Sequence, residues 1–452
     1  MNNSKNLQVF KIQKNDYLKN GEISVSQRIE ILLKLKKILI DNQNEIENAL
    51  FIDLGKSKNQ AFYSELALVF SSLKHTIKNI SKWTKKSKVK TPWFLKPSKS
   101  YIKYEAHGVV GIYSPWNYPI MLTFDPLIAA IAAGNRVMLK VSEYSVNTSD
   151  LIMKLINSNF EESLIYCSNN NQLEFETFNN LKFDFIFFTG STHVGKIIAK
   201  RASENLIPCV LELGGKSPTI VFDDANIKNA AKMIAFGKYV NSGQTCVTHD
   251  FILVHENVAD DLQKELKKEF EVLHSTSSNS KIISQKHFER LLNILPTNLL
   301  DKLNYNKEKL EISPIVFETN LNEQIMKEEI FGSFLPVIKF KNSEELKTIL
   351  QDYQNPLALY IFTKSKKNLE IQNSFKSGSV IINDTISFLS NYNLPFGGVR
   401  TSGLGRYHGF DGFKAFSNQK SYFKSPSFMK PNPLVYGKES KKSKKILEWI
   451  FK

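Results

Sequence analysis

Short apolar runs alternate with helical segments along most of this chain, and no other feature constrains the fold as strongly. In the first half, apolar runs at 109–114, 137–141, 183–190 and 209–215 are separated by helical segments at 127–134, 145–157 and 191–204. Runs that are apolar throughout are typical of strands buried on both faces of a sheet. Strands that alternate with helices form parallel sheets. The sequence therefore predicts an α/β fold with a parallel sheet and helices on both of its faces.

The alternation continues in the second half, and the two ends of the chain differ from it. Strands are expected at 218–222, 251–255, 335–340, 357–363 and 379–383, and helices at 226–240, 258–273, 284–295, 343–353 and 366–375. Upstream, one helix is predicted to begin at a capping box formed by Ser24 and Gln27, and a second to run over 63–83. A proline-containing loop then leads to a strand or hairpin near 97–106, and an exposed strand is expected over 416–427.

Charge and cysteine content exclude several classes of protein. The formal net charge is +16, which suggests anionic partners, but 54 of the 60 basic residues are lysine. Recognition of nucleic acid favours arginine, so we expect no nucleic-acid partner and interpret the scattered lysines as solvated surface positions. The three cysteines lie 42 and 37 residues apart, a spacing that fits neither a disulfide framework nor a zinc site. No metal-binding motif appears among the acidic residues and histidines.

The sequence shows no targeting or membrane-spanning segment. The first residues lack the apolar stretch of a signal peptide. The most apolar stretch, 119–134, contains Asp125 and Pro126 and is shorter than the about 20 residues that cross a bilayer. We therefore expect a cytoplasmic protein.

Two segments suit a phosphate-containing ligand. In FFTGSTHVGKII, a strand leads to Gly190 and Ser191 at the start of a helix, where backbone N–H groups favour a pyrophosphate. Lys140 ends another strand and Glu143 follows in the next turn, at the edge of a parallel sheet where ligands bind. Taken alone, each segment also fits a simpler interpretation, an ordinary capped helix or a solvated loop.

Three further segments suit covalent catalysis. Cys246 follows the turn-forming run Asn-Ser-Gly-Gln, whereas the other two cysteines lie among apolar residues. Glu212 lies in an apolar strand, where burial would raise its pKa into the range of a general base. Asn117 lies in a stiff aromatic loop between two prolines and could supply an amide donor to an oxyanion. The simpler interpretations are a buried small thiol, a structural ion pair and an Asx-turn.

Together, and in this order, the motifs resemble those of the aldehyde dehydrogenase superfamily over nearly the whole chain. The series is PWNYP at 115, LKxSE at 139, FTGS at 188, ELGGKSP at 212, NSGQTC at 241, EEIFG at 328 and PFGGVxxSGxG at 395. The short N-terminus, the form of the cysteine motif, NPLALYIF at 355 and RYHGF at 406 resemble the class 3 branch, which includes fatty aldehyde dehydrogenases.

The resemblance implies a mechanism and a set of cofactor contacts. Cys246 matches the thiolate nucleophile, Glu212 the general base that activates water, and Asn117 the side-chain donor of the oxyanion site. The cofactor is NAD, with NADP as an alternative, held by Trp116, Lys140, Glu143, Gly190, Ser191, Glu329 and Phe331. Tyr118 and Phe396 are candidate walls of the aldehyde channel, and no metal is required.

Three residues depart from the family pattern. Val141 replaces the usual proline after Lys140, and Arg400 has no evident role. His249 lies three residues after Cys246, but spacing alone does not make it the partner of the thiol.

The resemblance also implies an organisation of the chain. We expect a Rossmann-like NAD(P)-binding domain at 1–94 and 108–211, and an α/β catalytic domain at 212–415. A bridging element would comprise 95–107 and 416–427, and its exposed strand predicts a homodimer. The tail, 428–452, combines an apolar stripe with lysines, which fits either weak contact with a membrane surface or an ordinary flexible or docked tail.

Three functions follow from these observations. The first is oxidation of medium- or long-chain aliphatic or aromatic aldehydes to carboxylates. The second, on the same fold, is oxidation of a small acidic semialdehyde. The third, a non-catalytic protein on this fold, is disfavoured because all three chemical positions are intact.

Overall fold

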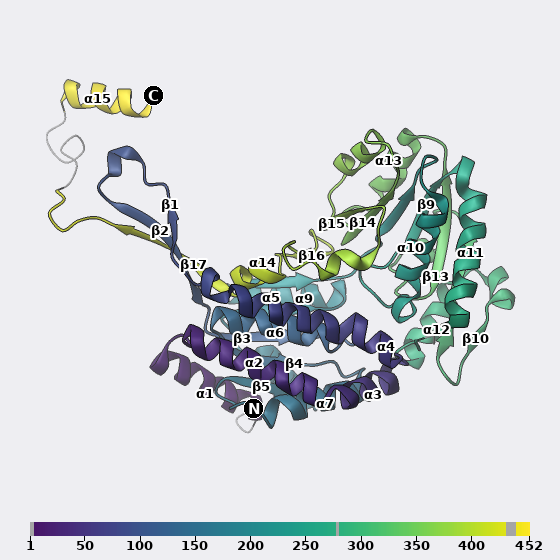
Figure 1. Ribbon diagram of the computed structural model, residues 1–452, viewed down its shortest axis with the longest axis horizontal. Helices are drawn as coiled ribbons and strands as arrows, with labels where there is room; N and C mark the ends of the chain where they lie inside the picture. The colour runs from purple at the N-terminus through teal and green to yellow at the C-terminus, as the bar shows by residue number, and fades with distance from the viewer. Residues whose placement is uncertain (1–3, 277–279, 431–439) are drawn as a thin grey trace.

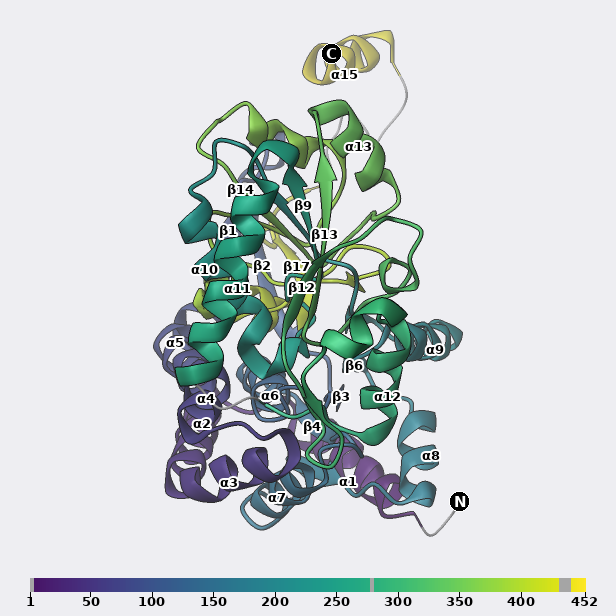
Figure 2. The ribbon, with the colours of Figure 1, turned by 90° about the vertical axis from the view of Figure 1, so that its right-hand side faces the viewer.

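The computed structural model describes residues 4–276, 280–430 and 440–452. Two six-stranded sheets with their helices form the body of the molecule, and a small three-stranded sheet projects from it as an arm (Figure 1). Viewed from the side, the first sheet and the N-terminal helices lie at one end of the body, and the second sheet at the other (Figure 2). The α/β fold expected from the alternating pattern is therefore confirmed.

The first sheet has the order β16-β7-β6-β3-β4-β5, and its strands are parallel except for β16. Alternate side chains of its strands enter two separate apolar clusters. One cluster contains residues of α1, α8 and α9, and the other contains residues of α2, α3, α5, α6 and α7. Both faces are thus covered by helices, which explains why these strands are apolar throughout. The strands are β3 (Val109–Tyr113), β4 (Arg136–Lys140), β5 (Ile165–Ser168), β6 (Phe185–Thr189), β7 (Cys209–Glu212) and β16 (Gly403–Leu404).

The helices around the first sheet follow local sequence signals. Ser24 and Gln27 form the predicted capping box, and Gly134 ends α6 in the left-handed conformation. The helices are α1 (Lys5–Asn20), α2 (Val25–Asp41), α3 (Gln43–Leu54), α4 (Lys58–Ala61), α5 (Ala67–Trp83), α6 (Met121–Ala133), α7 (Val146–Asn157), α8 (Gln172–Asn180) and α9 (Thr192–Glu204).

The second sheet has the order β12-β13-β9-β8-β14-β15 and is parallel throughout. Its strands are β8 (Pro218–Val221), β9 (Phe251–His255), β12 (Ile315–Glu318), β13 (Phe334–Phe340), β14 (Ala358–Phe362) and β15 (Ser379–Ile382). Its helices are α10 (Ile227–Tyr239), α11 (Ala259–Thr276), α12 (Gln285–Ile294) and α13 (Ser343–Gln351), and α14 (Gly409–Ala415) lies against α5 and α6. A short hairpin pairs β10 (Tyr305–Asn306) with β11 (Glu311–Ile312).

The arm is an antiparallel sheet of β1 (Ser87–Val89), β2 (Lys99–Ala106) and β17 (Ser417–Lys424), with a 3-10 turn at Trp93–Leu95. The exposed strand expected over 416–427 is therefore present, and it pairs with β2 along its whole length. The C-terminal helix α15 (Lys441–Phe451) lies beside the tip of the arm, where the rings of Phe94 and Phe451 are 5.2 Å apart (Figure 1).

Several elements differ from the sequence-based expectations. The segment 63–83 is helical as predicted, but its first turn, Phe62–Leu66, is π-helical and continues directly into α5. The segment 366–375 forms a 3-10 helix at Asn368–Ser374. Helices α1, α3 and α8 and strand β5 were not predicted. The predicted catalytic segment also contributes β16 to the first sheet, and the domain limits at 94, 107, 211, 415 and 427 stay a prediction.

Candidate active site

Cys246 is carried by a buried turn that connects α10 to β9. After α10 the chain makes a 3-10 turn in which Asn241, Ser242 and Gly243 all have positive φ. A Cβ on Gly243 would lie 2.2 Å from the Gly332 carbonyl oxygen, so this approach requires glycine. The Gln244 side chain fixes the turn by donating to the carbonyls of Asn241 and Lys281, each at 3.0 Å. Cys246 is thereby held on a rigid support.

Cys246 lies where two cavities meet. A cavity of about 220 Å³, which we call the tunnel, and one of about 150 Å³, which we call the cleft, share Cys246, Glu212, Thr189 and Leu122 as lining residues. The tunnel is lined mostly by apolar and aromatic side chains. The cleft is lined by Gly190, Ser191 and Glu329 among others. A thiol at such a junction can meet one reactant from each side.

The surroundings of Cys246 favour its neutral form. Burial, followed by the carboxyl groups of Glu329 and Glu212, raises the pKa of the thiol to about 12. The backbone N–H groups of Cys246 and Val247 act in the opposite direction, because they can donate to the sulfur. Burial raises the pKa of Cys167 to about 12 as well and raises that of Cys209. Neither of these two cysteines lines the tunnel or the cleft.

Asn117 is tied to the turn that carries Cys246. Its side-chain amide donates to the Gln244 carbonyl at 3.0 Å, and its own carbonyl accepts from the Asn241 side chain at 2.8 Å. An amide nitrogen carries two hydrogens, so one remains for an oxyanion beside the sulfur. The structure thus brings Asn117 and Cys246 together, as the sequence predicted.

A buried ion pair that sequence reasoning missed supports the Asn117 loop. Lys56 and Glu65, both fully buried, lie 2.6 Å apart. Lys56 also donates to the Asn117 carbonyl at 2.9 Å, and Glu65 accepts from the backbone N–H groups of Ile120 and Met121. Burial lowers the pKa of Lys56, and Glu65 counteracts this. The only sequence signal was that Glu65 falls in an otherwise apolar helical segment.

Glu212 ends β7 and is buried at the shared wall of the tunnel and the cleft. Among the described residues, neither carboxyl oxygen has a partner with hydrogen-bond geometry. Burial raises the pKa of Glu212 well above its ordinary value, as the sequence predicted, while Arg406 and the nearby Gly398 N–H oppose the shift. A proton-accepting group without a fixed partner is suited to take a proton from water.

The carboxyl ends of β4 and β6 carry the residues expected to bind a dinucleotide. Gly190 and Ser191 precede α9, where the Ser191 hydroxyl accepts from the Val194 N–H and the remaining N–H groups point outward from the helix. Lys140 ends β4, 4.0 Å from Glu143 and over the ring of Phe175. Burial lowers the pKa of Lys140. Lys140 and Glu143 lie outside the residues that line the cleft.

Glu329, Phe331 and Trp116 form the far wall of the cleft. A Cβ on Gly214 would lie 1.9 Å from a Glu329 carboxyl oxygen, so glycine at this position leaves room for the Glu329 carboxyl group. Burial and then Asp250 raise the pKa of Glu329 to about 8. The rings of Trp116 and Phe331 are 5.4 Å apart, and the His287 ring lies 5.3 Å from Trp116. Sequence reasoning missed His287, which no motif marks. A helix N-terminus, a lysine, carboxylates and aromatic walls are groups that fit a dinucleotide.

Tyr118 and Phe396, the two candidate walls of the aldehyde channel, both line the tunnel. The Tyr118 hydroxyl is 2.6 Å from the Thr245 hydroxyl, one residue before Cys246. In the described part of the chain, no Lys or Arg lines the tunnel, and burial lowers the pKa of the lining His408 to about 3. Apart from the ionisable groups of Glu212 and Cys246, the described lining of the tunnel therefore contains no side chain that is charged at neutral pH.

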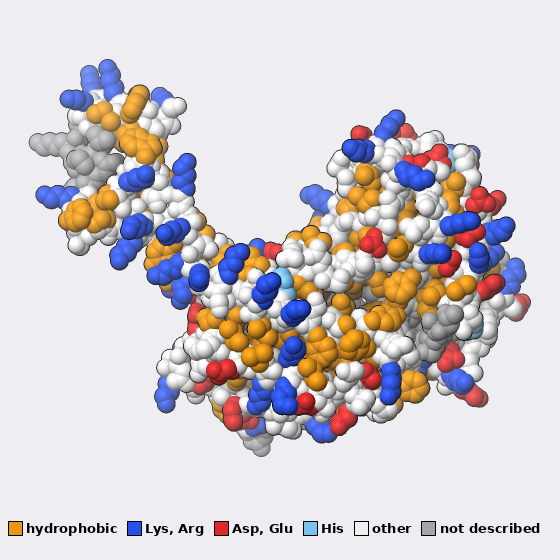
Figure 3. Space-filling view, viewed as in Figure 1, with side chains coloured by type: hydrophobic (Ala, Val, Ile, Leu, Met, Phe, Trp, Pro, Cys, Tyr) orange, Lys and Arg blue, Asp and Glu red, His pale blue; other side chains and the backbone are white. Residues whose placement is uncertain are grey.

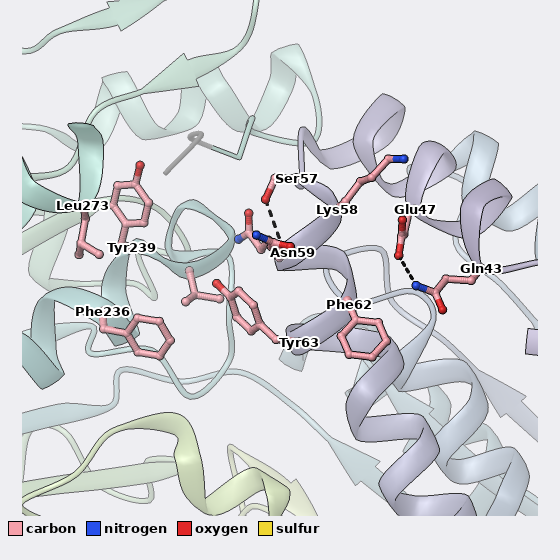
Figure 4. A pocket seen from close by; sticks show the side chains of 12 residues that line it. Gln43, Glu47, Ser57, Lys58, Asn59, Phe62, Tyr63, Phe236, Tyr239 and Leu273 are labelled. Atoms are coloured by element: carbon pink, nitrogen blue, oxygen red, sulfur yellow. Dashed lines mark hydrogen bonds between the residues drawn. The ribbon is translucent and has the colours of Figure 1, made fainter. Parts of the chain in front are cut away.

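The tunnel continues into a surface groove of about 880 Å³. Tyr63, Phe236 and Val240 line both, and the rings of Tyr63 and Phe236 lie 6.4 Å apart (Figure 4). Polar side chains, including Asn59 and Gln43, lie farther along the groove (Figure 4).

Two of the three departures from the family pattern, His249 and Arg400, have defined places in the structure. The nitrogens of His249 lie 2.6 Å from the Thr219 hydroxyl and 2.8 Å from that of Thr385. Both ring nitrogens are thus engaged by hydroxyl groups and neither is left to pair with the Cys246 thiol, and burial lowers the pKa of His249 to about 3. Arg400 has φ of 53° in the tight turn that bridges to Gly403. Within the described ranges, no group of three or more His, Cys, Asp or Glu is placed to hold a metal ion.

Comparison with known proteins gives consistent matches over most of the chain. The model of the aldehyde dehydrogenase family matches residues 10–422. The chain is 42% identical to the 4,4'-diaponeurosporen-aldehyde dehydrogenase of Staphylococcus aureus, over 89% of this chain and 90% of that protein. It is 36% identical to aldehyde dehydrogenase family 3 member B3 of Mus musculus, over 93% and 90%. Among solved structures, the substrate-bound state of Staphylococcus aureus AldH superposes with a TM-score of 0.94 at 38% identity and covers 99% of each chain.

Proposed function

This chain belongs to the aldehyde dehydrogenase family, as a member of its class 3 branch, and we propose that it oxidises apolar aldehydes to carboxylates through Cys246. The observation that carries the proposal is the position of Cys246 and Glu212 at the junction of an apolar tunnel and a cleft that fits a dinucleotide. The aldehyde would enter through the tunnel, and NAD or NADP would occupy the cleft.

The proposed reaction has two stages. The Cys246 thiolate attacks the aldehyde carbon, and the Asn117 amide and the Cys246 N–H donate to the resulting oxyanion. NAD(P)+ supplies the hydride acceptor in the cleft. Loss of hydride leaves a thioester on Cys246. Glu212 then takes a proton from water, the hydroxide attacks the thioester, and the carboxylate is released as the thiol is restored.

The cofactor would be bound by residues from several elements. Gly190, Ser191 and the N–H groups of α9 would hold the pyrophosphate, and Lys140 and Glu143 the adenosine ribose. Glu329 would bind the nicotinamide ribose, with Trp116 and Phe331 as walls. The Glu143 carboxylate would repel a 2′-phosphate and so favours NAD over NADP.

An activity screen tests the role of Cys246. The purified chain is incubated with NAD and a panel of aldehydes, and NADH formation is measured beside Cys246→Ala and the matched control Cys209→Ala. We expect activity in the wild type and in the control, and a loss of at least about a thousandfold in Cys246→Ala. Equal activity in all three proteins would contradict the assignment.

We propose that the preferred aldehydes are medium- or long-chain aliphatic, or aromatic, because the tunnel is apolar and opens into the groove at Tyr63 and Phe236. A small acidic semialdehyde finds no cation in the described lining of the tunnel. In a series of increasing chain length, we expect Phe236→Ala to raise KM for the long aldehydes and to leave KM for short ones unchanged. An equal change at every length, or a preference for a semialdehyde, would contradict this proposal.

We also propose a cytoplasmic homodimer with weak membrane contact through the tail, 428–452. All three cysteines lie in the described part of the chain and are free thiols, which suits a reducing compartment. The outer edge of β17 has no strand partner among the described residues, and such an edge can pair with a second copy. No helix in the ranges that the structure describes is long and apolar enough to cross a bilayer.

A further inference from the structure

The positive charge of this protein is concentrated on the arm and the helix beside it. We define the arm surface as residues 84–104, 417–430 and 440–452. These segments contain fifteen lysines and one acidic residue, Glu448, a net charge of +14 out of +16 for the whole chain. The remainder of the chain is therefore close to neutral. The lysines of this part of the molecule are solvated surface positions, as expected, but they are clustered and not scattered.

The lysines of the arm surface are available to an external partner. Fourteen of the fifteen are exposed, and only Lys420 and Lys452 take part in ion pairs among the described residues. Six of them line a groove of about 1060 Å³ on the β1–β2 hairpin, together with Trp93 and Tyr101. In Figure 3, lysine and apolar side chains cover the arm, whereas acidic side chains are gathered on the body.

Large aromatic side chains are exposed among these lysines. Trp93 at the hairpin is 62% exposed, Phe428 78%, and Trp449 and Phe451 on α15 are 79% and 66% exposed. Exposing these large rings to water costs free energy. Tryptophan and phenylalanine beside lysines are typical of surfaces that insert at the boundary between lipid headgroups and acyl chains. Since α15 has eleven residues, it can lie on a bilayer but cannot cross one.

These observations favour one class of partner. A nucleic acid would be expected to select arginine, and the arm surface contains none. A second copy of the chain carries the same net charge of +16, so charge does not favour it as the partner of these lysines. An anionic bilayer matches both the lysines, which act as point charges on its surface, and the rings, which enter it.

We propose that the arm surface, hairpin and α15 together, docks this protein on the surface of anionic phospholipid membranes. The proposal extends the contact well beyond the tail, because about half of the charge lies on the hairpin, at 84–104. It does not depend on the reaction at Cys246, and its test does not measure activity.

Vesicle flotation of the full chain tests the proposal. We expect binding to vesicles of phosphatidylcholine mixed with phosphatidylglycerol, no binding to phosphatidylcholine alone, and release at high salt. The charge variant replaces four lysines of α15 with glutamine, and the matched control replaces four exposed lysines of the body. The charge variant carries Lys441→Gln, Lys442→Gln, Lys444→Gln and Lys445→Gln, and the control carries Lys228→Gln, Lys232→Gln, Lys264→Gln and Lys267→Gln.

The variants have distinct expected results. The α15 variant should bind anionic vesicles about tenfold more weakly or worse, and the body control should bind like the wild type. A chain that ends at residue 437 should keep weaker, salt-sensitive binding through the hairpin lysines. Equal binding of the α15 variant and the control, or complete loss of binding in the truncated chain, would contradict the proposal. Retention of RNA or DNA by a chain that does not bind vesicles would also contradict it.

Discussion

At the scale of single residues, the site could be predicted where the chemistry lies within one short motif. Cys246, Glu212 and Asn117 were each found from a local pattern, and the structure brings all three to one junction. Lys56 and His287 were missed because their partners lie far away in the sequence, at Asn117 and Trp116. Such contacts depend on the fold, and no local pattern marks them.

The acidity of Cys246 gives a prediction at this scale. Burial and two carboxyl groups raise the pKa of its thiol to about 12, so the reactive thiolate is scarce at neutral pH and increases as pH rises. In the protein alone, we expect alkylation of Cys246 by iodoacetamide to accelerate about tenfold per pH unit from about pH 7 to 9. Peptide mass spectrometry after timed quenching gives the rate for each cysteine. A rate that levels off below pH 8 would show a thiol more acidic than the structure indicates.

At the scale of elements, burial made the central strands of each sheet predictable, although β5 was missed and it is buried throughout. Strands covered on both faces must be apolar throughout, so β3, β4, β6 and β7 stand out in the sequence. Helices α1, α3 and α8 have polar outer faces and weak periodicity, and they were missed. The π-helical turn at Phe62–Leu66 was also unpredicted, and it includes Glu65, which a regular helix across this segment would place differently.

The ion pair at this turn gives a prediction for the element it supports. Glu65→Gln keeps an acceptor for the backbone of the Asn117 loop but leaves the Lys56 cation buried without a counter-charge. We expect a loss of about 3–5 kcal/mol in the free energy of unfolding, seen as a lower thermal midpoint. The double variant Lys56→Met/Glu65→Leu should lose less.

An exposed pair serves as the control for this prediction. Lys37 and Asp41 lie 2.7 Å apart on the surface of α2. Asp41→Asn should change the free energy of unfolding by less than about 1 kcal/mol. If Glu65→Gln costs no more than Asp41→Asn, the buried pair does not hold the loop.

At the scale of the whole molecule, composition alone was misleading. We interpreted the net charge of +16 as surface charge, but its concentration on one arm appeared only when the fold brought 84–104, 417–430 and 440–452 together. On the same arm, one edge of β17 has no strand partner within the part of the chain that the structure describes. We therefore expect the arm to serve assembly along its strands and a membrane at its tip.

Assembly gives the prediction at this scale. Sedimentation equilibrium should report twice the chain mass of 51.7 kDa across a dilution series, because pairing at β17 satisfies backbone groups that are otherwise left to water. The dimer should resist high salt, since backbone hydrogen bonds are not screened as surface charges are. A mass of one chain at every concentration would contradict this arrangement.

The central claim is that Cys246 forms a thioester which Glu212 then helps water to cleave. The most direct measurement is intact and peptide mass spectrometry of Glu212→Gln, quenched in acid after mixing with NAD and an aldehyde substrate. The same measurement on Glu212→Gln/Cys209→Ala is the control. We predict one acyl group per chain on the Cys246 peptide in both proteins, with one equivalent of NADH formed and turnover then stalled. Full turnover without an adduct, or an acyl group on another residue, would contradict the account.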